Sequence, residues 1–205
     1  MPKPLMLLLS LLLASNTFAQ SSPLIPADQA VDGASQLEWS QRWWQWALSF
    51  DRVRSPVADR TGQMCASRQS GKVWFLAGTY GTARTERTCH VPAGKVLFFP
   101  LINFVTFRAE GGDEPCASLV ARAAALTNKP SALVLDIDGQ RFDKLQTHRL
   151  SHDGCFSLVQ GQPADAASNG YYVALGPLTP GTHTINFGGI LPTMVQAVTY
   201  RLVVE

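Results

Sequence analysis

The sequence predicts a mainly β protein, a jelly-roll-like β-sandwich with two α-helices added in its N-terminal half. Three observations lead to this prediction. The C-terminal half contains several short strand-like runs separated by Gly, Pro and Asp-Gly turns, which is the spacing of a sandwich. Two runs in the N-terminal half are apolar at nearly every position, as in strands covered on both faces. Two further stretches combine helical periodicity with helix-start signals.

The first 19 residues have the pattern of a secretory signal peptide. Lys3 precedes the apolar run Leu5–Leu13, and small residues lead to a cleavage point between Ala19 and Gln20. The run is too short to cross a bilayer whose hydrocarbon core is about 30 Å thick, although a buried first helix is an alternative. We therefore expect a periplasmic or secreted protein that does not span the membrane.

Composition narrows the class of protein. The formal net charge is +2 and the basic residues form no cluster, so nucleic acid is not an expected partner. Only 16% of residues are charged and no low-complexity tract occurs, which is typical of a compact domain. Beyond the signal peptide, the length fits an extended arm over 20–34 followed by a single domain over 35–205.

Four cysteines in an exported chain predict two disulfides. We favour Cys65–Cys89 and Cys116–Cys155, because each pair brackets one contiguous piece of chain, although the other pairings stay open. A zinc site or a catalytic thiol is the alternative, but the chain has no C-x-x-C and no histidine at a usual zinc spacing. Closing a loop of about 25 residues should stabilise the fold by about 3 kcal/mol.

The element after the arm is predicted to be a tryptophan-rich helix. Ser35 and Glu38 have the spacing of a capping box, which predicts a helix from Ser35 to about Phe50. On a helical wheel its apolar residues form two lines. One line contains Trp39, Trp43, Trp46 and Phe50, and the other contains Leu37, Trp44 and Leu48.

This helix is apolar around more than half its circumference, which is wider than one ordinary packing stripe. One interpretation is that it lies wedged between a sheet and a layer of loops. The other is that part of the face formed by Trp39, Trp43 and Trp46 lines a ligand groove or meets a partner, because an exposed tryptophan stripe is costly unless it is used.

The stretch from Cys65 to Pro100 is predicted to organise the fold. It holds two strand-like runs, Lys72–Tyr80 and Lys95–Pro100, and both are apolar on both faces. We expect them to be inner strands of the sandwich, with the Cys65–Cys89 bridge joining the loop between them. Pro100 should mark a bulge or the end of its strand, because proline cannot donate to a ladder.

A second helix and a series of strands are predicted after this stretch. Asp113 can cap a helix that runs to about Thr127, with Leu119, Ala123 and Leu126 on its apolar face. The rest is predicted as strand over Ala132–Ile137, Arg141–Leu145, Cys155–Gln160, Tyr171–Leu175, His183–Phe187 and a terminal strand that includes Val198–Val204. Gly188-Gly189 is expected to end the fifth of these.

The chain contains none of the common hydrolase, dinucleotide, P-loop or zinc-protease motifs, so we expect no cofactor and no metal. His148 and His152 would share a face only on a helix, and their context is that of a loop. Asp136 and Asp138 resemble the start of a calcium loop, but the later ligands are missing and a hairpin turn is favoured.

Two polar residues lie at positions where a pocket is expected. His90 follows the closing cysteine of the organising stretch, and Asn103 lies just past its second strand. A polar group at the end of an interior strand often faces a pocket. We therefore take His90 and Asn103, with Trp39, Trp43 and Trp46, as candidate ligand-binding residues.

Five motifs together resemble a family of exported bacterial proteins without an established activity. They are W-x-x-x-W-W-x-W (Trp39–Trp46), D-x-T-G-x-x-C (Asp59–Cys65), V-W-F-L-A-G-T (Val73–Thr79), R-x-C-x-V-P-A-G-K-x-L-F-F-P (Arg87–Pro100) and P-L-x-P-G-x-H-T-I (Pro177–Ile185). The resemblance covers nearly the whole chain after the signal peptide and implies a single exported domain. It implies no catalytic or ligand residues. Asn186 departs from the family pattern, where a second histidine is expected.

The function expected from these observations is a non-enzymatic binding or interaction module of the envelope, for a small molecule or an envelope protein. Aromatic residues are plentiful and no catalytic set can be assigned. One alternative is a secreted hydrolase whose site assembles only in three dimensions, for example around His90 or His148 with a carboxylate. The other is a subunit of a periplasmic complex.

Overall fold

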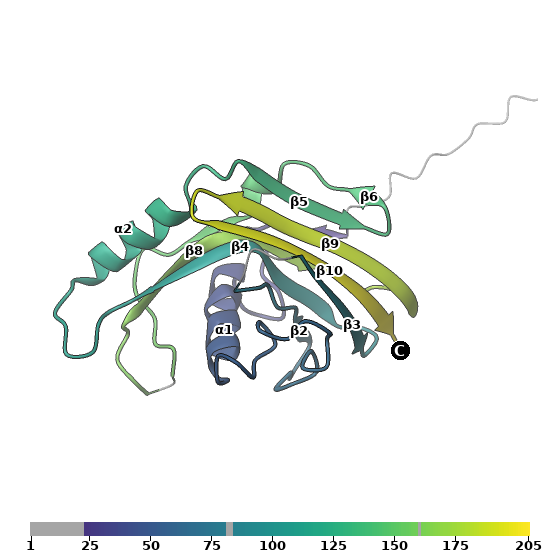
Figure 1. The fold of residues 1–205 in the computed structure, drawn as a ribbon, viewed down its shortest axis with the longest axis horizontal. Helices are drawn as coiled ribbons and strands as arrows, with labels where there is room; N and C mark the ends of the chain where they lie inside the picture. Colours follow the sequence, from purple (N-terminus) through teal and green to yellow (C-terminus); the bar gives the residue numbers. More distant parts are fainter. Residues whose placement is uncertain (1–22, 81–83, 160) are drawn as a thin grey trace, which may run out of the picture.

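The computed structural model describes residues 23–80, 84–159 and 161–205, so the predicted signal peptide and the start of the arm lie outside the described residues. Two five-stranded sheets pack face to face, and two helices accompany them (Figure 1). Helix α1 (Gln36–Leu48) lies under one sheet, and α2 (Cys116–Thr127) packs at the end of its two central strands. The predicted β-sandwich with two helices is confirmed.

The sheets differ in strand order. The first has the order β1-β8-β4-β2, with β7 also paired to β8, and the second has the order β3-β10-β9-β5-β6. The strands of the first sheet are β1 (Leu24–Ile25), β2 (Val73–Phe75), β4 (Val96–Phe107), β7 (Arg149–Ser151) and β8 (Ala166–Leu175). Those of the second are β3 (Thr85–Val91), β5 (Ala132–Ile137), β6 (Gln140–Arg141), β9 (Gly181–Leu191) and β10 (Met194–Val204). The pairs β2–β4 and β3–β10 are parallel.

The first sheet separates two hydrophobic cores. Along β8, Tyr171 and Val173 point into the core between the sheets, whereas Tyr172 and Ala174 point into the core beneath α1. The same alternation holds along the first half of β4. Strands buried on both faces carry apolar residues at every position, which explains the composition of the run at the start of β4.

The first run of the organising stretch differs from the prediction. Only Val73–Phe75 forms a strand, and this strand lies at the edge of its sheet. The side chain of Gln69 occupies the open edge: its amide nitrogen donates to the Phe75 carbonyl at 2.8 Å, and its amide oxygen accepts from the Phe75 N–H at 2.9 Å. One side chain thus replaces the neighbouring strand that an interior position would have.

The second run is longer than predicted. Strand β4 continues to Phe107 through a bulge between Pro100 and Ile102, so Pro100 marks an irregularity and not the end of the strand. Asn103 therefore lies within β4. Strand β3 was not predicted, and His90 lies near its end.

Three C-terminal predictions were also wrong in detail. Of the expected strand over Cys155–Gln160, the described residues 155–159 form a single bridge at Phe156, and Gln160 lies outside the described residues. The predicted return over Arg141–Leu145 forms only the short β6, and a 3-10 turn, η1 (Leu145–His148), follows. The Gly188-Gly189 pair lies inside β9 and does not end it. Glycine is required at position 188, because a Cβ there would come within 2.1 Å of the Gln196 carbonyl oxygen on β10.

The helix starts follow the prediction in part. The Ser35 hydroxyl accepts from the Glu38 N–H at 3.2 Å, but the Glu38 carboxylate pairs with Arg42 at 2.5 Å and does not reach back to Ser35. Helix α2 begins after Pro115, with no side-chain cap, and so starts later than a cap at Asp113 would place it. Arg42, one turn along the helix, pairs with the Glu38 carboxylate, so the return bond from Glu38 to Ser35 that would complete the capping box is absent.

Both predicted disulfides are present, Cys65–Cys89 and Cys116–Cys155. The first joins the loop after α1 to β3, and the second ties the start of α2 to the segment before β8. Two such bridges fit an oxidising compartment outside the cytoplasm. Among the helices of the described residues, none has the length and apolarity needed to cross a membrane.

Arg87 holds the loops above α1 in place. Its side chain is buried on β3 and donates to the carbonyls of Asp59, Ala77, Val57 and Gly78, and to the Tyr200 hydroxyl, at 2.7–3.2 Å. None of these five hydrogen bonds is to a carboxylate. A buried guanidinium whose donors are all used in this way fixes several backbone segments at once.

Candidate functional site: an apolar groove beside α1

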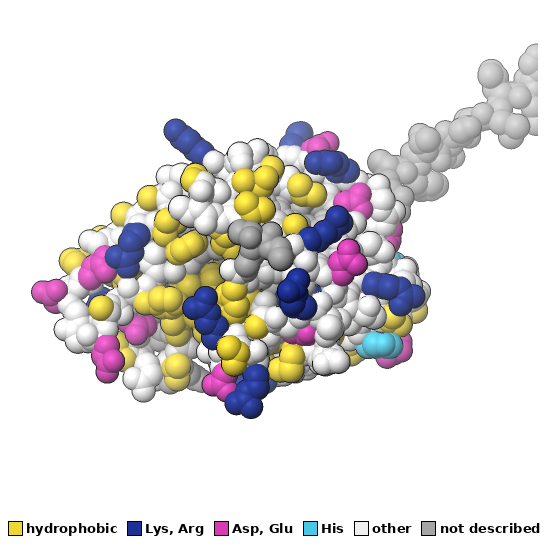
Figure 2. All heavy atoms as spheres, viewed as in Figure 1, with side chains coloured by type: hydrophobic (Ala, Val, Ile, Leu, Met, Phe, Trp, Pro, Cys, Tyr) yellow, Lys and Arg dark blue, Asp and Glu magenta, His cyan; other side chains and the backbone are white. Residues whose placement is uncertain are grey.

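A groove of about 400 Å³ runs between α1, the end of β4 and the loop that follows β2. Hydrophobic side chains gather on this face of the molecule, over α1 and the neighbouring strand (Figure 2). We call this feature the apolar groove, and its lining residues are Trp43, Trp44, Leu48, Phe50, Arg52, Val57, Gly78, Thr79, Tyr80, Asn103, Phe104, Val105, Phe107, Met194 and Gln196. Small-molecule sites have volumes of about 300–1,000 Å³, so the groove has room for a small ligand.

The wall formed by α1 comes from the line of Trp44 and Leu48. Trp44 is buried, but its indole N–H has no hydrogen-bond partner in the described residues. The Tyr172 hydroxyl is the polar group beside it, close enough for the indole to act on the pKa of Tyr172 without reaching hydrogen-bond geometry. Burial dominates that pKa and raises it far above its ordinary value.

The other tryptophans of α1 are tied to backbone carbonyls. The indole N–H groups of Trp39, Trp43 and Trp46 donate to Val31, Leu76 and Ser67 at 2.7, 3.0 and 3.0 Å. All three side chains are buried at 8% exposure or less, so they belong to the core beneath the first sheet. For these three tryptophans, the interpretation that α1 packs between a sheet and a layer of loops is the one that applies.

These three predicted residues are distributed over two hollows. Trp43 lines the apolar groove, while Trp39 and Trp46 line a second hollow of about 440 Å³ on the other side of the helix. In that second hollow the Arg42 guanidinium lies 4.4 Å from the centre of the Trp39 ring, a distance suited to a cation–π contact. The predicted tryptophan face is therefore divided between the two hollows.

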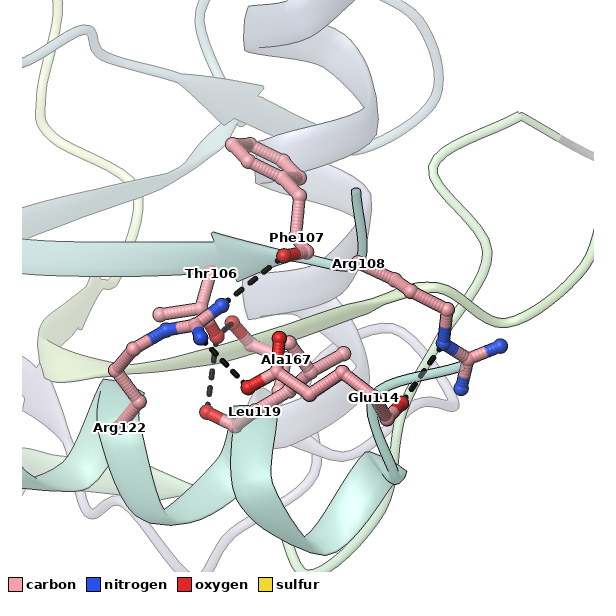
Figure 3. Close-up of polar contacts among 7 residues, drawn as sticks. All are labelled: Thr106, Phe107, Arg108, Glu114, Leu119, Arg122 and Ala167. Atoms are coloured by element: carbon pink, nitrogen blue, oxygen red, sulfur yellow. Dashed lines mark hydrogen bonds and ion pairs between the residues drawn. The ribbon is translucent and has the colours of Figure 1, made fainter. Parts of the chain in front are cut away.

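The opposite wall of the groove is the end of β4, which α2 holds in place. The Thr106 hydroxyl lies within hydrogen-bond distance of the Leu119 and Ala167 carbonyls, at 2.9 and 3.2 Å, and Arg122 donates to the Phe107 carbonyl at 3.0 Å (Figure 3). Arg122 also pairs with Glu114 at 2.6 Å. The Phe107 ring points away from α2 toward the groove, and it is 44% exposed (Figure 3).

The floor of the groove is polar but already paired. The Asn103 amide donates to the Tyr172 hydroxyl at 3.0 Å. The Gln196 amide donates to the Pro100 and Leu101 carbonyls at 3.0 and 2.8 Å and accepts from the Thr79 N–H at 3.0 Å. These bonds fix the Asn103 and Gln196 side chains, so the floor of the groove is rigid.

The rim carries the only charge among the lining residues. Arg52 is exposed, and its guanidinium lies 5.2 Å from the centre of the Tyr80 ring. Its neighbour Arg54 pairs with Asp51 at 3.0 Å. In the part of the chain that the structure describes, no carboxylate pairs with Arg52.

The predicted site residue His90 lies away from the groove, on β3 at the edge of the second sheet, where its Nδ1 is 3.0 Å from Glu205. A second histidine–carboxylate pair joins His183 and Asp138 at 2.7 Å. Burial lowers the pKa of His183, but the bonds to Asp138 and to the Thr179 carbonyl outweigh it and leave the pKa raised. Neither pair lines the apolar groove, so the groove brings together Trp43 and Asn103 but not His90.

The histidines considered as metal ligands lie apart from the groove too. His148 ends η1, and burial lowers its pKa more than a hydrogen bond to the Tyr172 backbone raises it. His152 contacts Gln41 of α1 at 2.8 Å. Within 23–80, 84–159 and 161–205, no three His, Cys, Asp or Glu side chains are grouped so that they could hold a metal ion.

Several residues of the groove were missed by the sequence analysis. Trp44 and Leu48 belong to a predicted apolar line of the helix, but the predicted site residues come from the other line. Nothing in the sequence marks Phe107 or Arg52 as a site residue, because an isolated phenylalanine after a strand and an arginine in a loop are common on protein surfaces.

No family model, curated protein or solved structure matches this chain. The groove must therefore be interpreted from its own chemistry.

Proposed function

We propose that this protein is an exported, non-enzymatic binding module of the envelope and that the apolar groove takes a small apolar ligand. The observation that carries the proposal is the groove itself: its walls are aromatic and aliphatic, yet they stand open on the surface at Phe107 and Tyr80, which are 44% and 40% exposed. Open apolar surface of this kind is costly and marks binding sites.

The location in the envelope is supported by two features. The signal-peptide pattern of residues 1–19 directs the chain out of the cytoplasm. The two disulfides, Cys65–Cys89 and Cys116–Cys155, would persist in an oxidising compartment. Cell fractionation of the producing bacterium tests this part of the proposal, and protein retained in the cytoplasm would contradict it.

Binding is tested with N-phenyl-1-naphthylamine, a neutral apolar probe that becomes fluorescent in apolar sites. The disulfide-bonded protein should bind it saturably with one site per chain. Leu48→Asp places a charge on the groove wall and should abolish the signal, because a charge is poorly solvated in an apolar site. Circular dichroism should show that this variant keeps the fold.

The matched control is Ile190→Asp, which adds the same charge to an apolar side chain of β9 that is 41% exposed and outside the groove. It should bind the probe as the unmodified protein does. Equal loss in both variants, or no saturable binding in the unmodified protein, would contradict a binding function for the groove.

A further inference from the structure

The groove contains a strong asymmetry of charge. Among its fifteen lining residues, Arg52 alone is charged, and it stands at the rim. Both amides of the floor make hydrogen bonds within the protein: the Asn103 amide nitrogen donates to Tyr172, and the Gln196 amide makes three bonds. A ligand in the groove thus meets an apolar interior and one cation at the mouth.

Arg52 is prepared to receive an anion. Among the described residues its guanidinium lies over the face of the Tyr80 ring, 5.2 Å from the ring centre, and because the side chain is exposed the N–H donors on its edge are left in water. Arginine is weakly hydrated for a cation, and its planar fork matches a carboxylate with two parallel hydrogen bonds. Asp51, the adjacent carboxylate, is already paired with Arg54.

The helix end nearby opposes an anion only weakly. Helix α1 ends at Leu48, and the unpaired carbonyls of a helix C-terminus carry partial negative charge. Here two of them are bonded, because the Ser49 hydroxyl donates to the Trp46 carbonyl at 2.8 Å and Arg68 donates to the Ser49 carbonyl. The full charge of Arg52 therefore decides the sign of the field at the mouth of the groove.

We propose that the natural ligand is a single-chain anionic amphiphile, with an acidic head group at Arg52 and a hydrocarbon or aromatic body in the groove. The inference rests on the proposed function and specifies its ligand class. A volume of about 400 Å³ is at the low end of small-molecule sites and suits one chain, not the two chains of a membrane lipid. A quaternary ammonium ligand would suit the aromatic walls but would be repelled by Arg52.

Three probes with the same tail test the head group. Dodecanoate, dodecan-1-ol and dodecyltrimethylammonium, each below its critical micelle concentration, are titrated in competition with N-phenyl-1-naphthylamine. Dodecanoate should bind at least about tenfold more tightly than the alcohol, as one charge-assisted hydrogen bond predicts, and the cation should bind most weakly. Raising the salt concentration should weaken dodecanoate and leave the alcohol unchanged, since the head group is exposed.

Arg52→Gln removes the charge from an exposed side chain and should not affect folding. It should weaken dodecanoate about tenfold and leave dodecan-1-ol within twofold. Arg60→Gln is the matched control, because it removes the same charge from an exposed side chain that lies outside the lining of the groove and pairs with no carboxylate among the described residues, and it should leave all three probes unchanged. Flotation with phosphatidylglycerol vesicles should show no binding.

The outcomes separate the two proposals. If the neutral probe binds but dodecanoate binds no better than the alcohol, or if Arg60→Gln has the effect expected of Arg52→Gln, the anionic head group is wrong and the groove still binds. If the vesicles bind and dodecanoate does not, a membrane lipid replaces the single-chain ligand. If neither the neutral probe nor any amphiphile binds saturably, the proposed function fails with the inference.

Discussion

Trp43 and Trp44 are adjacent in the sequence, both are buried and both line the apolar groove, but their indole N–H groups are used differently. The Trp43 indole donates to the Leu76 carbonyl at 3.0 Å, and its ring makes edge contacts with Trp46 and Tyr172. The Trp44 indole has no such acceptor and lines the wall of the groove.

This difference extends to the two apolar lines of α1. Each tryptophan of the line through Trp39, Trp43 and Trp46 is fixed by a backbone carbonyl of a different loop segment, so this line holds the loops onto the helix. The line of Trp44 and Leu48 borders the groove together with Trp43 and Phe50, but the Trp44 indole N–H makes no such bond. A tryptophan whose N–H is used by the protein's own backbone is a structural residue, whereas one without an acceptor is a candidate for contact with a ligand.

The largest expected effect comes from releasing the loops that pack against the backbone-bonded tryptophans of α1. Arg87→Leu would remove a donor from each carbonyl that Arg87 now satisfies, including that of Gly78 near the acceptor of Trp43, while the Ala77 carbonyl would keep the Tyr200 hydroxyl as a donor. We expect the free energy of unfolding to fall by about 4 kcal/mol, measured by urea denaturation under oxidising conditions. Arg84→Leu, at an exposed position just before β3, should change it by less than about 0.5 kcal/mol. If the two variants lower the free energy of unfolding equally, the hydrogen bonds of Arg87 do not hold the loops as proposed.

A smaller effect distinguishes the two tryptophans directly. Trp43→Phe leaves the Leu76 carbonyl without its donor and should cost about 2 kcal/mol in the free energy of unfolding. Trp44→Phe removes a buried N–H that has no acceptor and should cost less than about 1 kcal/mol while weakening binding of N-phenyl-1-naphthylamine. Thermal and urea denaturation with a probe titration measure both quantities. The comparison is wrong if Trp44→Phe proves the more destabilising of the two.

The smallest effect concerns the polar side of α1 and depends on pH. Burial lowers the folded-state pKa of His148 and of His152, which contacts Gln41, below the ordinary value of 6.5. The folded protein therefore binds fewer protons than the unfolded chain, so stability is full above pH 6.5 and falls as the pH decreases below it. Each histidine can remove at most about 1.4 kcal/mol per pH unit.

Melting temperatures between pH 7.5 and 5 measure this loss, and His152→Gln should reduce it. His183 acts in the opposite direction, because its raised pKa gives stability that is present below pH 6.5 and is lost as the pH rises through its folded-state pKa. His183→Asn should therefore steepen the loss at low pH. A melting temperature that increases as the pH falls in both variants would contradict these assignments.

The parts of the fold that could be predicted are those in which neighbours in the sequence share one environment. The periodicity of α1 and the apolar runs of β4 and β8 follow from burial on regular faces. The disulfide pairs could be predicted because each encloses one continuous segment.

The rest depends on contacts between distant segments. Strand β3 has a regular alternation of buried and exposed residues, but polar Thr85 and Arg87 occupy inward positions, so its pattern is hidden in the sequence. Gly188-Gly189 was interpreted as a break, whereas Gly188 allows close approach of β10. The choice between the two lines of α1 was equally hidden, because it depends on which loops cover the helix.

Strands β4 and β8 form a wall of both cores and carry the face that meets the second sheet, and β4 also lines the groove. Neither strand can leave one core without opening the other, so the sandwich and the layer of α1 should melt in a single transition. A ligand that binds only the folded groove then stabilises the whole molecule by RT ln(1 + [L]/Kd), including the distant edge of β6. Occupancy of the groove would thus be reported by amide hydrogen exchange in strands that never touch the ligand.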